Sequence, residues 1–373
     1  MTDREALLYP TISDRDGLED YLQDLADLLP GIERNVAKLK RSPQDREIIS
    51  EIFRALHNLK GDATICRVEL GVLLVHPLET LFSRMRAGEV ILSDVLAEVV
   101  LLTLDRLEMA LDALAEGRTI AHLQLPKLVD GLDALAQANG LMLETTSLQL
   151  IEGVTGFRPA AIGRTFTATA VKTAGGSSGR AAAHASGDLH FFMELSTLLD
   201  ARSPLFKGRT ARLLRLAQET NVAAGKPVES MQLEAAIYMH DIGMMFMPES
   251  AWLKPGKLNA DELALLHAHP GHGAGLLARM HGWEEAARIV REHHEMPDGG
   301  GYPAKLKGEQ ICDGAKIVAI VDAFESITTK HAQRGQGRSV LRAIAEINAS
   351  DNQFDPFWIG HFNGVVRKRL EAT

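Results

Sequence analysis

The sequence lacks the features that mark membrane-spanning, secreted and nucleic-acid-binding proteins. Its 373 residues contain no uninterrupted apolar run of about 18 residues, and the acidic start MTDREALLYPTISDRDGLED has no basic-then-apolar signal peptide. The formal net charge is -9, and no lysine-rich or arginine-rich block could neutralise a nucleic-acid backbone. We therefore expect a soluble protein that binds no membrane, DNA or RNA, whereas a small anionic ligand held locally remains open.

Cysteine is also scarce, because Cys66 and Cys312 are the only two in the chain. They lie far apart in the sequence, which favours reduced thiols over a disulfide framework. We therefore expect the protein to be cytoplasmic.

The first third of the chain has a helical pattern. Apolar residues recur at steps of three and four, and we interpret Pro30, Ser42-Pro43, Gly88, Gly117 and Gly140 as helix ends. Short connections between the helices favour an up-and-down bundle. The five predicted amphipathic helices cover residues 17–41, 45–63, 68–88, 92–117 and 125–140.

The helical pattern weakens between residues 140 and 188. The stretch TATAVKTAGGSSGRAAAHASG consists of small residues and is typical of a flexible linker. Helical patterns return from residue 189. We therefore predict an all-α chain with a helical bundle at 1–139, a linker at 140–188 and a second helical domain at 189–373.

The second domain contains a group of side chains that can bind hard metal ions. Imidazoles and carboxylates together suit iron, manganese, zinc or nickel, and the lack of cysteine among them argues against a structural zinc site. A single histidine on an apolar helix is usually a hydrogen-bonded core residue, but six such ligands make coincidence a poor explanation. The candidate ligands are His240, Asp241, His269, His293, His294 and Asp322.

Asp241 directly follows His240 in this group. Neighbouring residues on a helix point about 100° apart, so the carboxylate could bridge two ions while the imidazole binds one. Two ions about 3.5–4 Å apart can activate a water and stabilise both the attacking and the leaving oxygen of a phosphoryl displacement. The pattern therefore indicates phosphoester hydrolysis.

The order of motifs in this half resembles the HD-GYP family of bacterial cyclic di-GMP phosphodiesterases. The matching stretches are HDIG at 240–243, WLKPGKLNADE at 252–262, HAHPGHGAGLL at 267–277, REHHEMPDGGGYP at 291–303 and KIVAIVDAFESIT at 316–328. The resemblance implies cleavage of cyclic di-GMP to pGpG or GMP by divalent ions. Iron or manganese is favoured, zinc or nickel stays open, and the count of ions, one or two, is also left open.

The resemblance also implies a role for each matching position. His240 and Asp241 would act in catalysis and bind metal, with Asp241 as the bridge; His269, His293 and His294 would bind mainly the second ion, and Asp322 would complete the first. A substrate-side loop would present Tyr302 to a base and lysines to phosphate. The implied substrate-binding residues are Asp298, Gly301, Tyr302, Pro303, Lys305, Lys307 and Arg334.

Four positions depart from the family pattern. Arg209 stands where the family has an early histidine ligand, and a guanidinium cannot bind metal because it stays protonated. Met244 replaces a lysine beside the reacting phosphate, Ala304 replaces an arginine, and HAQR at 331–334 keeps only the last residue of an RPYR-like stretch. Losing one preorganised charge contact can slow catalysis by roughly 10²–10³. We expect Arg209 to supply part of the lost positive charge if it points into the site.

The first domain carries a candidate phosphoacceptor histidine. His57 and Lys60 lie three residues apart and share a helix face, and Gly61 would let a partner approach closely. His76 and Glu79 are also three apart on the next helix. A carboxylate there could fix the tautomer of the first imidazole and leave its other nitrogen free as a nucleophile.

These residues resemble a histidine phosphotransfer (HPt) domain of the kind found in chemotaxis-type histidine kinases. The matching stretches are IFRALHNLKGDA and VHPLETLFSRMRAGE. The resemblance implies that His57 is phosphorylated with help from Lys60, and that His76 and Glu79 orient it. GxGxxG and P-loop patterns are absent, so we expect the phosphoryl group to come from a sensor histidine kinase or a response-regulator receiver domain.

We interpret the chain as a signalling protein in which phosphotransfer at His57 regulates hydrolysis of cyclic di-GMP. Two alternatives remain open. One is a catalytically degenerate adaptor that binds protein partners or nucleotide without turnover, and the other is a phosphohydrolase for a different nucleotide. Apolar helix faces also leave a homodimer open.

Overall fold

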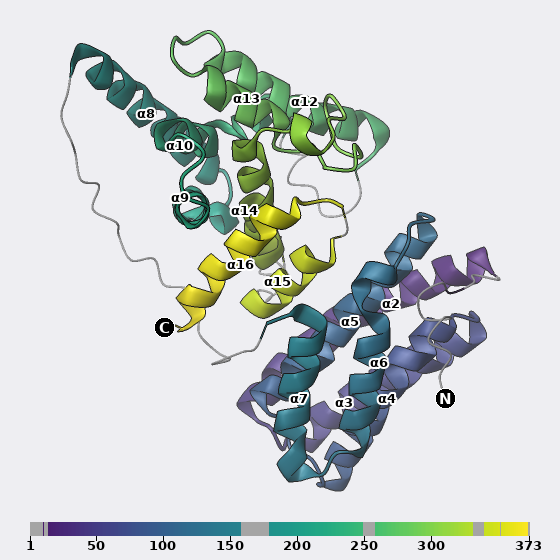
Figure 1. Ribbon diagram of the computed structural model, residues 1–373. Coiled ribbons are helices and arrows are strands. Elements are labelled where there is room, and N and C mark those ends of the chain that lie inside the picture. Colours follow the sequence, from purple (N-terminus) through teal and green to yellow (C-terminus); the bar gives the residue numbers. More distant parts are fainter. Residues whose placement is uncertain are drawn as a thin grey trace. The chain divides into compact units, whose positions relative to one another are not determined.

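The computed structural model describes residue 10 and residues 14–157, 179–248, 258–330, 339–350 and 352–371. Regular structure within these ranges is entirely helical, which confirms the predicted all-α class. None of the helices found there is both long and apolar enough to cross a membrane. The chain divides into two compact units, which are Met1–Arg164 with His331–Ala349, and Thr165–Lys330 with Ser350–Thr373 (Figure 1).

The first unit is a bundle whose helices run lengthwise beside one another (Figure 1). Neighbours in sequence pack on each other, as α2 does on α3 and α3 on α4, while α5 also packs on α2. The helices are α2 (Arg15–Arg41), α3 (Arg46–Ile65), α4 (Glu69–Ala87), α5 (Asp94–Ala115), α6 (Leu125–Gln137), α7 (Gly140–Thr155) and α15 (Val340–Ala349), with a 3-10 turn η1 (Ala121–Leu123).

Local signals in the sequence explain where several of these helices begin and end. The side chains of Asp14, Asp45 and Ser93 accept hydrogen bonds from free backbone amides in the first turns of α2, α3 and α5. Gly88 ends α4 in the left-handed conformation, with a φ of 80°. These caps account for the agreement between the five predicted helices and α2 to α6.

Pro30, which we interpreted as a helix end, lies inside α2, because the helix continues through it to Arg41 as the predicted helix over 17–41 does. Proline removes one backbone hydrogen bond from the helix interior. Leu29 and Ile32 on either side of it are buried, and packing of this apolar stripe stabilises the continuous helix. Pro77 and Pro270 likewise lie inside helices.

Residues 140–155, which lie in the stretch expected to be a linker, form α7 and pack on α5 and α6. Asn139 caps this helix by accepting from the amide of Met142. Leu143, Leu150 and Ile151 are buried, at the spacing of one helix face. The mixed polar residues between them weakened the pattern in the sequence.

Helix α15 comes late in the sequence but belongs to the first unit, where it packs on α5 and α7. Arg342 donates from Nε to Asp105 Oδ2 at 2.6 Å and from Nη2 to Glu33 Oε1 at 2.8 Å. Arg106 donates in turn to the carbonyl of Ala345 at 3.0 Å. Buried polar groups are thus paired across this contact, as burial in an apolar core requires.

The second unit packs its helices around a core that includes α9, α10, α13 and α14. Helix α16 was not predicted from the sequence; it packs on α9 and α14 and buries Trp358 and Phe362. The elements are α8 (Gly179–Asp200), η2 (Pro204–Phe206), α9 (Arg209–Ala223), α10 (Ser230–Met239), η3 (Ile242–Phe246), α12 (Ala260–Leu277), α13 (Glu284–Glu292), η4 (Gly308–Gln310), α14 (Asp313–Lys330) and α16 (Pro356–Glu371).

Candidate functional site

The six candidate metal ligands of the second unit come together from four helices. His240 and Asp241 follow the end of α10, His269 lies in α12, His293 and His294 follow α13, and Asp322 lies in α14. They form two groups that share Asp241, one with the three later histidines and one with His240 and Asp322. We call these the histidine-rich group and the carboxylate group.

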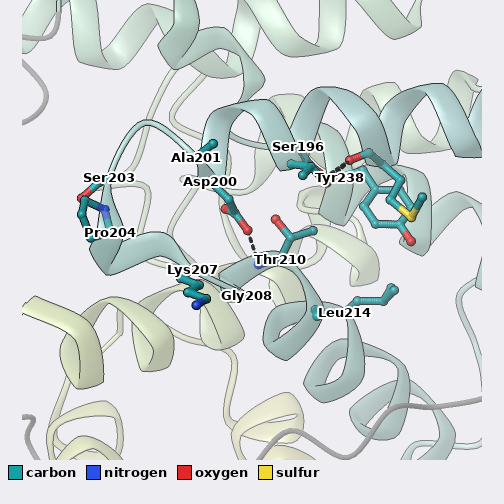
Figure 2. Close-up of a pocket in the computed structure, with 13 residues that line it drawn as sticks. Ser196, Asp200, Ala201, Ser203, Pro204, Lys207, Gly208, Thr210, Leu214 and Tyr238 are labelled. Atoms are coloured by element: carbon teal, nitrogen blue, oxygen red, sulfur yellow. Dashed lines mark hydrogen bonds between the residues drawn. The ribbon is translucent and has the colours of Figure 1, made fainter.

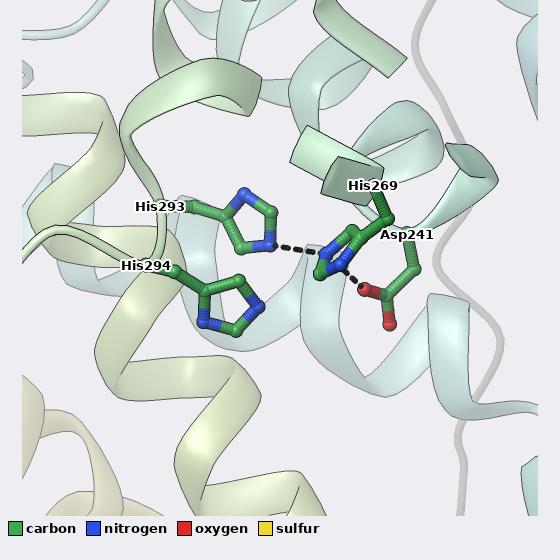
Figure 3. A group of neighbouring side chains, drawn as sticks. All are labelled: Asp241, His269, His293 and His294. Carbon is green, nitrogen blue, oxygen red and sulfur yellow. Dashed lines mark hydrogen bonds and ion pairs between the residues drawn. The ribbon is translucent and has the colours of Figure 1, made fainter. Parts of the chain in front are cut away.

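The histidine-rich group has the donors and spacing that a divalent ion needs. One ligand atom from each of its four residues lies within 4.8 Å of the others. His269 Nε2 is 3.3 Å from Asp241 Oδ1 and 3.4 Å from His293 Nε2. Dashed lines mark both contacts in Figure 3. Three imidazoles and a carboxylate are a common donor set for transition metals.

Hydrogen bonds fix which nitrogen each buried imidazole presents to the centre. The Nδ1 atoms of His240, His269 and His293 lie 2.8, 2.6 and 2.7 Å from the carbonyl oxygens three residues earlier. A carbonyl can only accept, so Nδ1 carries the proton and Nε2 keeps a lone pair when the ring is neutral. This second contact is the one that usually orients a metal-binding histidine.

Protonation also favours metal binding in the histidine-rich group. Burial, followed by the neighbouring imidazoles His294 and His269, holds the pKa of His293 well below its usual value. Burial, followed by His269, lowers the pKa of His294 to about 4. Both rings are therefore neutral at pH 7, which is the form that binds metal. The residues of this group fit a divalent ion.

Two glycines allow the ligand-bearing elements to approach closely. A Cβ on Gly243 would lie 2.1 Å from the carbonyl oxygen of His269, and a Cβ on Gly273 would lie 2.9 Å from that of Met239. Side chains at these positions would push η3 and α10 away from α12. The glycines thus keep Asp241 within reach of His269.

The guanidinium of Arg209 lies between the side chains of the carboxylate group. This arginine begins α9, is buried, and donates from Nη2 to Asp241 Oδ2 at 2.8 Å and also to Asp322 Oδ1. The same nitrogen lies 3.4 Å from His240 Nε2. A cation that stays protonated therefore already contacts all three donors of this group.

The electrostatics of the carboxylate group match this arrangement. Burial opposes ionisation of Arg209, but Asp241 and Asp322 outweigh it and raise the arginine pKa above its usual value. Burial likewise opposes ionisation of Asp322, but Arg209 first and then His240 lower its carboxyl pKa. Burial also lowers the pKa of His240, yet Asp241 and Asp322 outweigh it and raise this pKa to about 10. The carboxylates are thus charged and balanced by protein cations.

The loop after His294 folds back over the histidine-rich group. Tyr302 stacks between His267 and His294, with ring centroids 4.0 and 4.8 Å apart. Buried Glu295 accepts hydrogen bonds from the backbone amides of Ala304 at 2.6 Å and Leu306 at 2.8 Å, which anchors the loop. A Cβ on Gly301 would lie 2.5 Å from the carbonyl oxygen of His294, so only glycine fits there.

The other predicted substrate-binding residues lie at the surface of this loop. Asp298 is exposed and accepts a hydrogen bond from the amide of Gly300 at 2.7 Å, so it shapes the turn. Pro303, Lys305 and Lys307 are also exposed. Arg334 lies outside the described residues.

A cavity of about 570 Å³ lies next to the first turn of α9 (Figure 2). Its lining includes Met193 and Leu214 and is mostly apolar. Asp200 Oδ2 accepts a hydrogen bond from the backbone amide of Thr210 at 3.2 Å, which fixes the start of the helix. This contact holds the backbone beside Arg209 in place.

The first unit brings its four predicted polar residues together on α3 and α4. Glu79, which is buried, accepts from His57 Nδ1 at 2.6 Å and also from Lys60. His76 Nδ1 lies 3.5 Å from the same carboxylate. Partial burial raises the pKa of Glu79, but the hydrogen bonds from Lys60 and His57 outweigh it, so this pKa lies below its usual value. The ionised carboxylate therefore fixes the tautomer of His57.

The surface around His57 is open. The side chain of His57 is 61% exposed, and its ring stacks on Phe53. A Cβ on Gly61 would meet nothing within 4 Å, so packing inside the protein does not require glycine there. Lys60 pairs with Glu79 rather than standing free beside His57.

Comparison with known families identifies both halves of the chain. Residues 16–117 match the model of the Hpt domain, and residues 194–357 match the model of an HD domain. The chain joins an Hpt domain to an HD domain. This confirms the two resemblances seen in the sequence.

Relatives of the HD domain are phosphodiesterases of cyclic dinucleotides. The chain is 34% identical to the "Cyclic di-GMP phosphodiesterase response regulator RpfG" of Xanthomonas campestris, over 40% of this chain and 41% of that protein. It is 36% identical to "Cyclic di-GMP phosphodiesterase PA4108" of Pseudomonas aeruginosa over 32% and 28%. It is 33% identical to "3'3'-cGAMP-specific phosphodiesterase 2" of Vibrio cholerae over 36% and 24%. The chain thus matches less than half the length of each of these relatives.

A solved structure also aligns with the chain. This is "Bd1817, a HDG"Y"P protein from Bdellovibrio bacteriovorus", with a TM-score of 0.37 and 14% identity, over 74% of this chain and 73% of that chain.

Sequence reasoning missed two residues that support the centre of the HD domain. His267 contributes a ring to the stack on Tyr302, and Glu295 anchors the loop. His267 stands beside a predicted ligand in the stretch HAHPGH, which was an available signal. Nothing local in the sequence marks Glu295, because its partners are backbone amides nine and eleven residues later.

Proposed function

We propose that the HD domain hydrolyses a phosphodiester bond of a cyclic dinucleotide, with cyclic di-GMP as the favoured substrate. The observation that carries this proposal is the histidine-rich group, whose four ligands face one point beside the loop that holds Tyr302. The similarity of the HD domain to two proteins named as cyclic di-GMP phosphodiesterases supports the proposal. Iron or manganese is the favoured ion, because imidazoles and carboxylate are mixed in one site.

In this proposal each residue of the HD domain has a distinct task. A bound divalent ion supplies Lewis acidity and lowers the pKa of a bound water. Asp241 and the three histidines hold the ion, and the carbonyls behind His269 and His293 keep their rings in one tautomer. Tyr302, whose ring is stacked between His267 and His294, offers its hydroxyl to a base, and exposed Lys305 and Lys307 attract the anionic substrate.

We also propose that the Hpt domain takes up a phosphoryl group on His57 Nε2. Glu79 holds the proton of Nδ1, so Nε2 keeps its lone pair for attack on phosphorus. The phosphoryl donor is a histidine kinase or a receiver domain, which docks on the exposed face around His57 and Gly61. The phosphorylation state of His57 then regulates the HD domain. Free cysteines at Cys66 and Cys312 support a cytoplasmic site of action.

A non-catalytic adaptor is the second candidate, and Arg209 and Met244 favour it. Arg209 takes the space between the side chains of the carboxylate group, and Met244 provides no charge beside the proposed site. Such a protein would bind the cyclic dinucleotide or a partner without cleaving it. Helix α8 exposes apolar side chains, including Phe191 and Leu198. Either candidate function is therefore compatible with a homodimer.

Anaerobic purification followed by metal analysis and a turnover assay separates these candidates. We expect manganese-loaded or iron-loaded protein to convert cyclic di-GMP to pGpG or GMP, and Asp241→Ala to abolish turnover. A parallel assay with 3'3'-cGAMP tests the substrate. Nucleotide binding without turnover in the metal-loaded protein would establish the adaptor instead.

Phosphotransfer is tested separately with a phosphorylated receiver domain. We expect labelled phosphate to move to the full chain and to be lost from the His57→Gln variant. His122→Gln, a change elsewhere in the first unit, is the control and should retain labelling. Label that persists in His57→Gln would refute the phosphoacceptor assignment.

A further inference from the structure

Arg209 lies where a second metal ion would have to bind. The candidate ligands of that ion are Asp241, Asp322 and His240. Arg209 Nη2 contacts Asp241 Oδ2 at 2.8 Å and His240 Nε2 at 3.4 Å, and it donates to Asp322 as well. One nitrogen atom thus occupies the point on which all three donors converge.

An ion and this guanidinium exclude each other. Carboxylate and imidazole ligands hold a transition metal at about 2.0–2.2 Å, so an ion bound to the three donors would overlap the space of Arg209 Nη2. The guanidinium cannot lose its charge to make room. It is also held in place, because Arg209 is buried and its helix starts at a turn fixed by Asp200.

The histidine-rich group remains free of this competition. Arg209 donates to Oδ2 of Asp241, whereas His269 faces Oδ1. Asp241 can therefore bind an ion through one oxygen while the other oxygen stays bonded to Arg209. The shared carboxylate joins one ion to one guanidinium.

We propose that the HD domain holds a single divalent ion in the histidine-rich group, and that Arg209 is a built-in cation in place of a second ion. This inference rests on the proposed function only for the presence of a metal centre. It assigns Asp322 to positioning Arg209, and His240 to pairing with Asp241 and Asp322, rather than to binding metal. Arg209 thereby becomes a permanent part of the centre that no chelator can remove.

Metal content of the purified full chain tests this inference without any activity measurement. After loading with manganese and removal of free ions, inductively coupled plasma mass spectrometry should find one ion per chain. Arg209→His, which replaces the guanidinium with a metal ligand, should raise the content to two. Arg212→His is the matched control on the same helix, since Arg212 pairs with Glu325, and its content should stay at one.

Asp322→Ala provides a test that does not depend on creating a new site. A metal ligand would lose an ion when removed, whereas a partner of Arg209 would not, so we expect one ion per chain in this variant. Electron paramagnetic resonance should show an isolated Mn²⁺ ion in the unchanged protein and a coupled pair in Arg209→His. Two ions in the unchanged protein, or loss of an ion in Asp322→Ala, would overturn the inference.

The same measurements separate this inference from the proposed function. One ion per chain with no turnover would support the single-ion centre and defeat the phosphodiesterase. Turnover with two ions per chain would support the phosphodiesterase and defeat the single-ion centre. A chain that binds no ion under any loading condition would defeat both.

Discussion

Single residues in both domains solve the same chemical problem, which is to keep one nitrogen of an imidazole free. In the HD domain, backbone carbonyls accept from Nδ1 of His269 and His293 and leave Nε2 with its lone pair, as the proposed metal centre requires. In the Hpt domain, Glu79 accepts from Nδ1 of His57 and leaves Nε2 with its lone pair, as the proposed phosphotransfer requires. The acceptor at His57 is a carboxylate rather than a carbonyl, and its negative charge would stabilise the positive charge that develops on the ring in the proposed attack on phosphorus.

Glu79→Gln should weaken phosphotransfer without abolishing it. Glutamine keeps an acceptor oxygen but loses the charge that supports His57 and pairs with Lys60. Loss of such an orienting partner costs on the order of tenfold to a hundredfold in comparable sites. Rates of labelling by a phosphorylated receiver measure the effect. Glu69→Gln, an exposed change on the same helix, should leave the rate unaltered, and an equal loss in both variants would contradict the role of Glu79.

The metal-free HD domain should lose stability as the pH falls from about 6.5 to about 4. His294 has an ordinary pKa of 6.5 when unfolded and about 4 when folded, so the unfolded chain binds the extra proton in this window. A shift of this size makes the free energy of unfolding about 3 kcal/mol smaller below pH 4 than at neutral pH. His240 has a raised pKa, and its stabilising effect is complete below 6.5 and lost as the pH rises toward 10.

Chelator-treated protein provides the measurement. All three tryptophans fall in the second unit, so tryptophan fluorescence during urea unfolding follows that unit alone. His294→Gln should show a smaller loss of unfolding free energy between pH 6.5 and pH 4 than the unchanged protein. Identical pH dependence in both would show that His294 is not buried as a neutral ring.

Among the elements, helix α15 has a position that its sequence does not reveal. It follows α14 of the second unit, yet it packs in the first unit through Arg342, which pairs with Asp105 and Glu33. These carboxylates lie more than two hundred residues earlier in the sequence. Their pairing explains why a charged residue is tolerated in a buried position.

Arg342→Ala should release α15 from the bundle. Removing one partner of a buried ion pair leaves the other charges unpaired and costs about 3–5 kcal/mol. Hydrogen exchange of the amides at 340–349, read by mass spectrometry, should accelerate by roughly a hundredfold or more. Arg118→Ala removes an exposed pair with Glu116 and should change exchange little, because surface pairs contribute about 0–1 kcal/mol. Unchanged protection of α15 in Arg342→Ala would refute this account.

Sequence reasoning succeeded for elements whose signals are local and failed for those that depend on distant partners. Spaced apolar residues and caps such as Asp45 and Ser93 defined the helices of the bundle. Pro30 misled because packing of α2 outweighs one lost hydrogen bond. The candidate ligands could be named from motif order, but the pairing of Arg209 with Asp241 and Asp322 could not, since the tertiary fold brings these three residues together from distant parts of the sequence.

At the scale of the whole molecule, the residues that match the two family models do not coincide with the two compact units of the structure. The HD match extends over 194–357 and so includes α15, which the structure assigns to the first unit. The chain therefore passes between the two units three times, after residues 164, 330 and 349. A fragment of residues 189–373 would expose apolar side chains of α15 that are buried in the full chain, including Leu341 and Ile344.

Cutting the chain once between the units should not release the first unit. A protease site inserted within residues 165–178 would give an amino-terminal fragment with α2 to α7 and a carboxy-terminal fragment with α15. We expect the two fragments to elute together in gel filtration after cleavage. With Arg342→Glu, repulsion by Asp105 and Glu33 should let them separate, whereas separation of the unchanged fragments would contradict the placement of α15.

Because α15 completes the first unit from a distant part of the sequence, two fragments of the protein should be able to complement each other. Two separately produced pieces, one ending before residue 165 and one beginning after it, carry matching halves of the contact between α15 and the bundle. Mixing them would rebuild the first unit from two parts, and a bundle changed at His57 could be combined with an unchanged HD domain.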